Sequence, residues 1–178
     1  QNAGPTMNGP EISIIIPAFN AERWLADAVK SVLAQTFSNW ELIIVNDGST
    51  DGTLQAARSF QDRRIRVLDQ ANAGVSAARN AGLAAATGSY IGFLDADDAM
   101  FPENLAHKLQ SLDRSGADWA FADVAVCGPD LVPTGEVIHG TDGDVLRAAL
   151  LQERPAVPLS CGNILASSRC FQAGIRLD

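Results

Sequence analysis

Several features that mark other classes of protein are missing from these 178 residues. No stretch approaches the roughly 18 uninterrupted apolar residues of a membrane span, and no secretory signal pattern is visible. Positive charge is also scarce, because 13 Lys and Arg face 21 Asp and Glu for a net charge of −8. We therefore expect no nucleic-acid surface, and no polybasic segment favours binding to anionic membranes.

Cysteine is scarce as well, with only Cys127, Cys161 and Cys170. Their number is odd, and their spacing is not that of paired metal ligands. Buried free thiols in a reducing compartment are the expected interpretation, with a disulfide or a metal role as the alternative. We therefore expect a cytoplasmic protein, with peripheral association at the inner face of the membrane as a further option.

Three common catalytic or phosphate-binding motifs are absent. The chain has neither the phosphate loop G-x-x-x-x-G-K-[ST] nor the dinucleotide fingerprint G-x-G-x-x-G after its first apolar run. The nucleophile elbow G-x-S-x-G is missing too. The two histidines are isolated: we expect His107 on the solvent side of a helix, and a metal contact for His139 is the less favoured option.

What the sequence does contain is a regular alternation of apolar patterns. Buried β-branched runs predict strands at 12–20, in the first part of 40–53, and at 64–70, 90–94 and 117–126, with Asp47 after the second strand. Helical spacing predicts helices at 24–33, 53–60 and 75–86, with another that opens at Pro102. In the first of these, Trp24 belongs to the apolar repeat. Such alternation predicts an α/β fold with a mostly parallel sheet and helices on both faces.

Acidic residues gather where the predicted strands end. Asp95, Asp97 and Asp98 follow the fourth strand, and right-handed crossovers bring Asp47 and Asn20 to the same edge. Asp95 and Asp97 are two apart, so their side chains leave an extended segment on the same side. Two such carboxylates suit a hard divalent cation that also binds phosphate, and the lack of His and Cys favours Mg²⁺ or Mn²⁺ over zinc.

One basic residue accompanies these acids. Arg79 lies in an otherwise small and apolar helix, "GVSAARNAGLAAATG". Its spacing permits an exposed helix cation. It equally permits a side chain that points at the sheet edge, near Asp47 and the phosphates or base of a ligand.

Four ordered segments resemble the family-two glycosyltransferases, inverting enzymes of the GT-A fold. They are "ISIIIPAFNAERWLADAVKSVLAQTF", "ELIIVNDGSTDGT", "NAGVSAARNAGLAAATGSYIGFLDADD" and "FPENLAHKL", and they cover residues 11–126. The resemblance implies metal-assisted transfer of a sugar from a nucleotide-diphosphate donor, typically a UDP-sugar, to a glycan or lipid-linked acceptor with inversion.

The resemblance also assigns roles to individual residues. It implies a nucleoside pocket formed by Pro17, Ala18, Phe19, Asn20 and Glu22. Asp47 would accept a hydrogen bond from the base, and Arg79 would contact the nucleotide. Asp95 and Asp97 correspond to the D-x-D pair: Asp97 would bind Mn²⁺ or Mg²⁺, and Asp95 would contact the ribose, or the metal through water. Asp98 would support either one and receives no separate role.

The resemblance weakens toward the C-terminus. In the family the general base lies beyond a segment like "AGIRLD", where this sequence ends at Asp178, so no base is assigned. We expect a leader or tag-like segment at 1–10, a nucleotide-sugar-binding domain at 11–126, and the truncated start of an acceptor-side region at 127–178.

Two alternatives to a complete transferase remain. The first is a nucleotide-binding, catalytically incomplete domain of the same fold. The second is a metal-dependent nucleotidyltransferase, which would carry a Gly-rich basic loop near its first strand. The segment "PAFNAERW" has one Arg and no Gly, so this second alternative is disfavoured.

Overall fold

The computed structural model describes residues 9–140 and 163–172. In chain order the elements are β1 (Ile12–Ala18), α1 (Leu25–Leu33), β2 (Trp40–Asp47), α2 (Thr53–Arg58), β3 (Ile65–Gln70), α3 (Val75–Ala85), β4 (Tyr90–Phe93), α4 (Asn104–Ser115), β5 (Trp119–Phe121), β6 (Val124–Cys127), β7 (Pro133–Ile138), β8 (Ile164–Ser167) and α6 (Arg169–Gln172). The predicted alternation of strands and helices is confirmed through α4. Cys161 lies outside the described residues.

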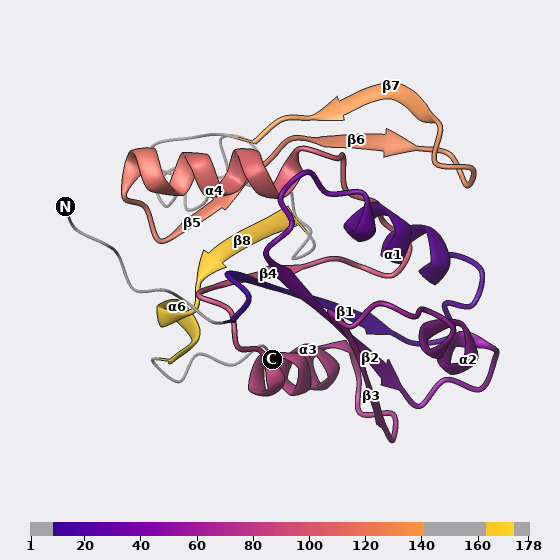
Figure 1. Ribbon diagram of the computed structural model, residues 1–178. Coiled ribbons are helices and arrows are strands. Elements are labelled where there is room, and N and C mark those ends of the chain that lie inside the picture. Colours follow the sequence, from indigo (N-terminus) through magenta and orange to yellow (C-terminus); the bar gives the residue numbers. More distant parts are fainter. Residues whose placement is uncertain (1–8, 141–162, 173–178) are drawn as a thin grey trace, which may run out of the picture.

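Six strands form the main sheet, in the order β3-β2-β1-β4-β8-β5. β1 pairs in parallel with both β2 and β4, and β2 pairs in parallel with β3. β8 runs antiparallel to its neighbours β4 and β5. The sheet is therefore mostly parallel, as predicted, and its parallel strands end at a common edge (Figure 1).

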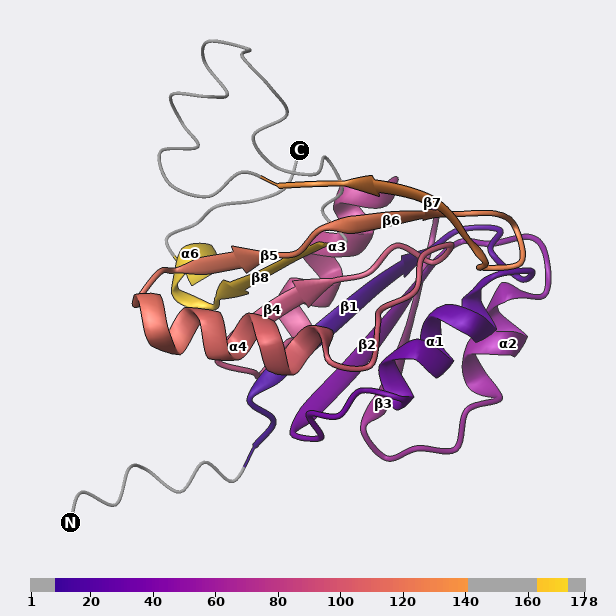
Figure 2. The same ribbon diagram turned by 90° about the horizontal axis from the view of Figure 1, so that it is seen from above.

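Helices cover both faces of this sheet, because the strands are apolar on both sides. Ile14 and Ile16 of β1 belong to one apolar core, which also contains residues of α1, α2 and α4. Ile15 belongs to a second core with Ala78 of α3 and Phe171 of α6 packed against it. Figure 2 shows α1, α2 and α4 on the opposite side of the sheet from α3. This confirms the prediction of helices on both faces.

The single strand predicted at 117–126 is wrong, because this stretch contains two strands. β5 joins the edge of the main sheet, whereas β6 pairs with β7 in a separate antiparallel hairpin. Between them, the side chain of Asn163 accepts a hydrogen bond from the Ala122 amide (3.3 Å) and donates one to the Ala122 carbonyl. A side chain thus satisfies backbone groups that a continuous strand would have paired in the ladder.

The position of β8 was not predicted. The structure inserts this strand, from the C-terminal part of the chain, between β4 and β5. Leu165 of β8 lies opposite Gly92 of β4 and is buried in the first core. Part of the 127–178 region therefore completes the main sheet. Its assignment as the start of an acceptor-side region stays a prediction.

The two described cysteines differ from expectation. Cys127 and Cys170 are free thiols, but Cys127 is exposed on the hairpin and Cys170 is only half-buried, so the expectation of buried thiols is wrong at Cys127 and is not met at Cys170. β7 is exposed along its whole length, whereas most residues of β6 are half-buried. His107 is exposed on α4, as predicted.

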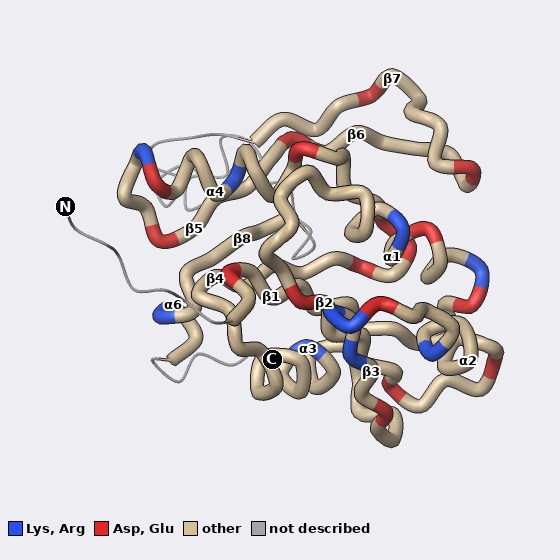
Figure 3. The backbone as a smooth tube through the Cα atoms, in the orientation of Figure 1, with Lys and Arg blue, Asp and Glu red and all other residues tan. Residues whose placement is uncertain are grey.

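Two further observations concern the distribution of charge and the apolar character of the helices. Acidic residues occur throughout the described chain, with basic residues interspersed among them (Figure 3). Within residues 9–140 and 163–172, no helix has the length and apolar character that crossing a membrane requires.

A buried carboxylate stabilises the edge of the sheet where the parallel strands begin. Oε1 of Glu41 accepts hydrogen bonds from the Ser13 hydroxyl (2.7 Å), the Thr87 amide (2.8 Å) and the Thr87 hydroxyl (2.7 Å). Arg66 lies 3.4 Å from the other carboxylate oxygen. Burial raises the pKa of Glu41, but these hydrogen bonds and the Arg66 charge outweigh it, so the pKa lies below its ordinary value of 4.5.

Candidate active site

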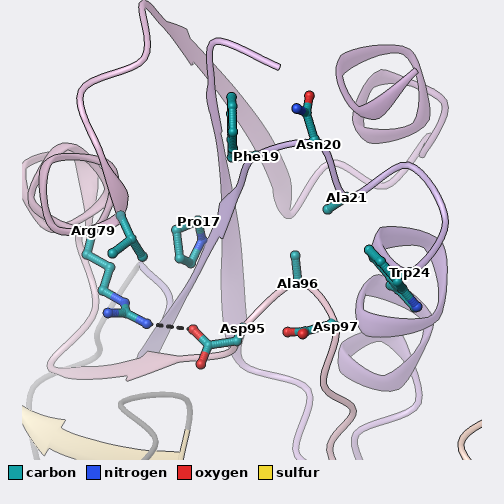
Figure 4. A pocket seen from close by; sticks show the side chains of 10 residues that line it. Pro17, Phe19, Asn20, Ala21, Trp24, Arg79, Asp95, Ala96 and Asp97 are labelled. Carbon is teal, nitrogen blue, oxygen red and sulfur yellow. Dashed lines mark hydrogen bonds and ion pairs between the residues drawn. The ribbon is translucent and has the colours of Figure 1, made fainter. Parts of the chain in front are cut away.

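A cleft of about 370 Å³ lies at the edge where β1 and β4 end (Figure 4). It is lined by Pro17, Phe19, Asn20, Ala21, Trp24, Val75, Arg79, Asp95, Ala96 and Asp97. These residues come from the end of β1, from the loops after β1 and β4, and from α3. The structure thus brings together most of the residues that the sequence assigned to a nucleotide and a metal.

One wall of the cleft is built from the loop after β1, which is tied to the loop after β2. Asn20 Oδ1 accepts a hydrogen bond from the Thr50 amide (2.9 Å), and the Asn20 amide donates to the Ser49 hydroxyl (3.0 Å). Asn20 has φ = 49°, a left-handed conformation that asparagine tolerates better than most residues. Its side chain thus fixes the loop, and the residue still lines the cleft.

Glu22 has a different position from the one expected. Its Oε2 accepts a hydrogen bond from the Gly52 amide at 2.9 Å, and Asp51 Oδ2 accepts one from the Glu22 amide at 3.2 Å. Glu22 does not line the cleft. It is placed to hold two loops together, and a nucleoside contact by its side chain stays a prediction.

Asp47 is likewise engaged within the protein. It is 3% exposed, and it accepts hydrogen bonds from Gln70 Nε2 (2.7 Å), the Ala73 amide (3.0 Å) and the Gly74 amide (2.9 Å). These bonds order the turn that leads into α3. Asp47 is not among the cleft-lining residues, and neither is Ala18, which is buried in the core. The proposed contact of Asp47 with the base is untested.

Arg79 reaches the sheet edge and pairs with an acid, although not with the one expected. Its Nη2 lies 2.6 Å from Asp95 Oδ1, and the two side chains are 14% and 30% exposed. A charge-assisted hydrogen bond this short in a partly buried setting fixes the direction of both side chains. Arg79 therefore supplies part of the counter-charge that the acidic segment needs.

Asp97 and Asp98 are less well compensated. Within the described residues, the Asp97 carboxylate is exposed and has no hydrogen-bond or ion-pair partner. Asp98 is positioned through its amide, which donates to the Asp95 carbonyl at 3.1 Å. Desolvation, together with the charges of Asp97 and Asp95, raises the pKa of Asp98. Negative charge therefore accumulates here and favours a cationic ligand.

This donor set fits a divalent ion that binds together with phosphate. Among the described residues, no three His, Cys, Asp or Glu side chains converge to hold an ion by themselves. Magnesium, however, is usually held by one or two carboxylates with substrate phosphates and water completing its shell. Asp97, with Asp95 beside it, supplies such a partial set.

Four cleft residues were not assigned to the site from the sequence, namely Ala21, Trp24, Val75 and Ala96. Trp24, assigned to the apolar repeat of the first helix, precedes α1 and is 39% exposed in the cleft. Val75 begins α3 and is also exposed there. A signal for Trp24 existed, because a large aromatic at the very start of a helix need not share the direction of the residues that follow.

A second cleft of about 490 Å³ adjoins the first, and Asp97 lines both. Its walls come from the segment before α4 and from the β6–β7 hairpin, and they include Met100, Phe101 and Leu131. Asp123 also lines it and lies 2.7 Å from His139 Nδ1. His139 is thus paired with an acid on the hairpin.

Comparison with known proteins establishes the family. Residues 13–164 match the family described as glycosyl transferase family 2, and the chain belongs to this family. The glycosyltransferase YibD of Escherichia coli strain K12 is 37% identical over 147 residues, which are 78% of this chain and 40% of YibD. The chain spans about half or less of the curated relatives that it matches.

Solved structures agree on the fold. TarS of S. aureus in complex with UDP-GlcNAc matches with a TM-score of 0.75 and 21% identity, covering 92% of this chain and 47% of TarS. Glucosyl-3-phosphoglycerate synthase of Mycobacterium tuberculosis, in complex with Mn²⁺, UDP and glucosyl-3-phosphoglycerate, matches with a TM-score of 0.62 and 23% identity. That match covers 90% of this chain and 58% of the synthase. The GT-A type of fold expected from the sequence is confirmed.

Proposed function

We propose that this chain is the donor-binding part of an inverting glycosyltransferase that takes a sugar from a UDP-sugar. The observation that carries the proposal is the meeting of Arg79, Asp95 and Asp97 in one cleft beside the loop after β1. Family membership supports transfer of a sugar, and the UDP-GlcNAc and UDP named for the TarS and synthase complexes support the choice of nucleotide.

Asp97 and Asp95 are the proposed ligands of a divalent ion, Mn²⁺ or Mg²⁺. The ion, when bound, supplies positive charge to the diphosphate as it leaves the sugar. Arg79 holds Asp95 in place through the 2.6 Å contact, so that Asp95 can face the ribose or the ion. Phe19 and Asn20 form the adjoining wall, where an aromatic ring and a fixed loop can receive the nucleoside.

The acceptor is proposed to enter through the second cleft. Because Asp97 lines both clefts, an acceptor hydroxyl there would lie close to the leaving diphosphate. A glycan or a lipid-linked glycan remains the proposed acceptor class. Inversion requires a base that removes the hydroxyl proton while the oxygen attacks the face opposite the diphosphate. No residue of this chain is assigned that role.

Titration with UDP tests the donor site. We expect calorimetry to show UDP binding that depends on added Mn²⁺, and to show that Asp97→Ala weakens it by about a hundredfold, the loss expected when a metal ligand is removed. Asp113→Ala, which removes an exposed acid on α4, serves as the matched control. UDP binding that is absent, or indifferent to both Mn²⁺ and Asp97→Ala, would contradict the proposal.

Turnover separates a transferase from a nucleotide-binding domain without activity. The two alternatives predict the same UDP titration, but only a transferase releases UDP from a UDP-sugar in an acceptor-dependent reaction. The measurement is UDP release, made on the full-length protein with and without candidate acceptors.

A further inference from the structure

Trp24 occupies a place in the donor cleft that the proposed function leaves without a role. Its side chain is 39% exposed, whereas Trp40 in β2 is 2% exposed. A large aromatic surface left in contact with water is costly unless a ligand covers it. Figure 4 shows Trp24 across Asp97 from the Arg79–Asp95 pair, at the far end of the cleft.

The backbone of Trp24 is fixed before any ligand binds, and one side chain contacts its ring. The Trp24 amide donates to the Ala21 carbonyl at 3.0 Å, and the Trp24 carbonyl accepts the amides of Asp27 (2.9 Å) and Ala28 (3.2 Å). The guanidinium of Arg23 lies over the indole, 5.7 Å from the ring centroid. A preorganised aromatic surface loses little conformational entropy on binding, which favours its use as a contact platform.

The order of the groups along a nucleotide-sugar determines which of them can contact the Trp24 ring. In a nucleotide-sugar the diphosphate stands between the nucleoside and the sugar. If the nucleoside lies against Phe19 on the Arg79 side of the cleft, as proposed above, and the diphosphate lies at Asp97, the sugar can extend beyond Asp97 toward Trp24. A pyranose ring has one face of C–H groups, and this apolar, weakly positive face suits the negative face of an indole.

We infer that Trp24 contacts the apolar face of the donor's pyranose ring and thereby contributes to selecting the sugar. This inference rests on the proposed function, because it needs the diphosphate at Asp97. It makes Trp24 a binding residue for the sugar alone, with no contact to the nucleoside.

The test compares UDP with UDP-GlcNAc and UDP-glucose by calorimetry, in the presence of Mn²⁺. For Trp24→Ala we expect the ratio of the UDP-sugar Kd to the UDP Kd to rise by roughly three- to tenfold for at least one sugar. Trp24→Phe retains a ring and should recover part of the loss. The matched control is Trp119→Ala on β5, because Trp119 is 37% exposed and lies outside the cleft.

Each outcome has a distinct meaning. If the wild-type chain binds UDP with Mn²⁺ but Trp24→Ala leaves the ratio unchanged for both sugars, the sugar contact is overturned and the donor site stands. The same holds if Trp24→Ala weakens UDP and both UDP-sugars equally, since the residue would then act on the nucleotide or on the fold. If the wild-type chain binds no UDP, the proposed function and this inference both fail.

Discussion

Carboxylates at two edges of the same sheet have opposite surroundings, because one has its partners within the protein and the other does not. Where the parallel strands begin, Glu41 has three hydrogen-bond donors and an arginine around it. Where they end, Asp97 has no partner within the described residues, and the pKa of Asp98 is raised by partial burial and by its acidic neighbours. At the first edge the carboxylate has its partners within the fold, whereas at the second edge the Asp97 carboxylate is left available for the proposed cation.

The difference separates a stabilising acid from a binding acid. A buried carboxylate whose acceptor sites are filled adds to the free energy of unfolding, and removing it leaves its donors unpaired. An exposed carboxylate among like charges adds nothing to the free energy of unfolding, and repulsion within the cluster lowers it. The Arg79–Asp95 pair lies between these cases, because one acid of the cluster is neutralised internally and the other two are left open.

The largest expected effect contrasts Glu41 with Asp97. Glu41→Ala should lower the free energy of unfolding by about 2–3 kcal/mol, because it removes three hydrogen bonds and leaves the buried Ser13 hydroxyl without this acceptor. Asp97→Ala should change it by no more than about 0.5 kcal/mol. Urea denaturation of both variants, with the exposed Glu136→Ala as control, measures the contrast. Equal losses for Glu41 and Asp97 would remove the distinction between the edges.

A smaller effect is expected from pH. The folded-state pKa of Glu41 lies below its ordinary value of 4.5, so its ionised form contributes stability that is fully present above that value. This contribution is lost as the pH falls through the lower, folded-state pKa. The melting temperature of the wild type should therefore exceed that of Glu41→Gln most at pH 7, and the gap should close in acid. A gap that does not vary between pH 7 and pH 3 would contradict the assignment.

The smallest effect should be found at Asp98, and it should have the opposite sign. Because the folded-state pKa of Asp98 is raised, its ionised form opposes folding at neutral pH, and this penalty disappears as the pH falls and the group is protonated. Asp98→Asn should therefore stabilise the unliganded protein at pH 7 by roughly 0.5 kcal/mol, since the group is only partly buried and water screens the repulsion from its neighbours. Thermal melts at pH 7 and pH 4, with Asp113→Asn as control, measure this. A destabilised Asp98→Asn variant would show that the cluster is compensated in some other way.

Some of the site could be predicted, because local pattern and topology suffice for it. The apolar runs predicted β1, β2, β3 and β4, and parallel pairing then brought the segments after β1 and β4 to one edge. The position of Asp95 and Asp97 followed from that, whereas the helix spacing left open whether Arg79 points at this edge or at solvent. The partner of Arg79 did not follow, because the helix register alone does not say which of several acids at the edge lies within reach.

Other features depended on contacts between residues far apart in the sequence. The break between β5 and β6 depends on Asn163, which is 41 residues from Ala122. Glu22 does not line the cleft, because its side chain accepts a hydrogen bond from the Gly52 amide in another loop. Trp24 fitted the apolar repeat of α1. It directly precedes the helix, however, and lies at the edge of the core, where the repeat no longer determines burial.

The sequence by itself determined the family, the alternation of elements and the acids after β4, since these depend on residue type and short-range periodicity. The tertiary structure alone decided which carboxylates are satisfied. Satisfaction depends on donors that arrive from other strands and loops: Glu41 meets Ser13 and Thr87 across the sheet, whereas Asp97 faces a cleft. The sequence gives no sign of this difference between the two carboxylates, because it arises from their neighbours in three dimensions.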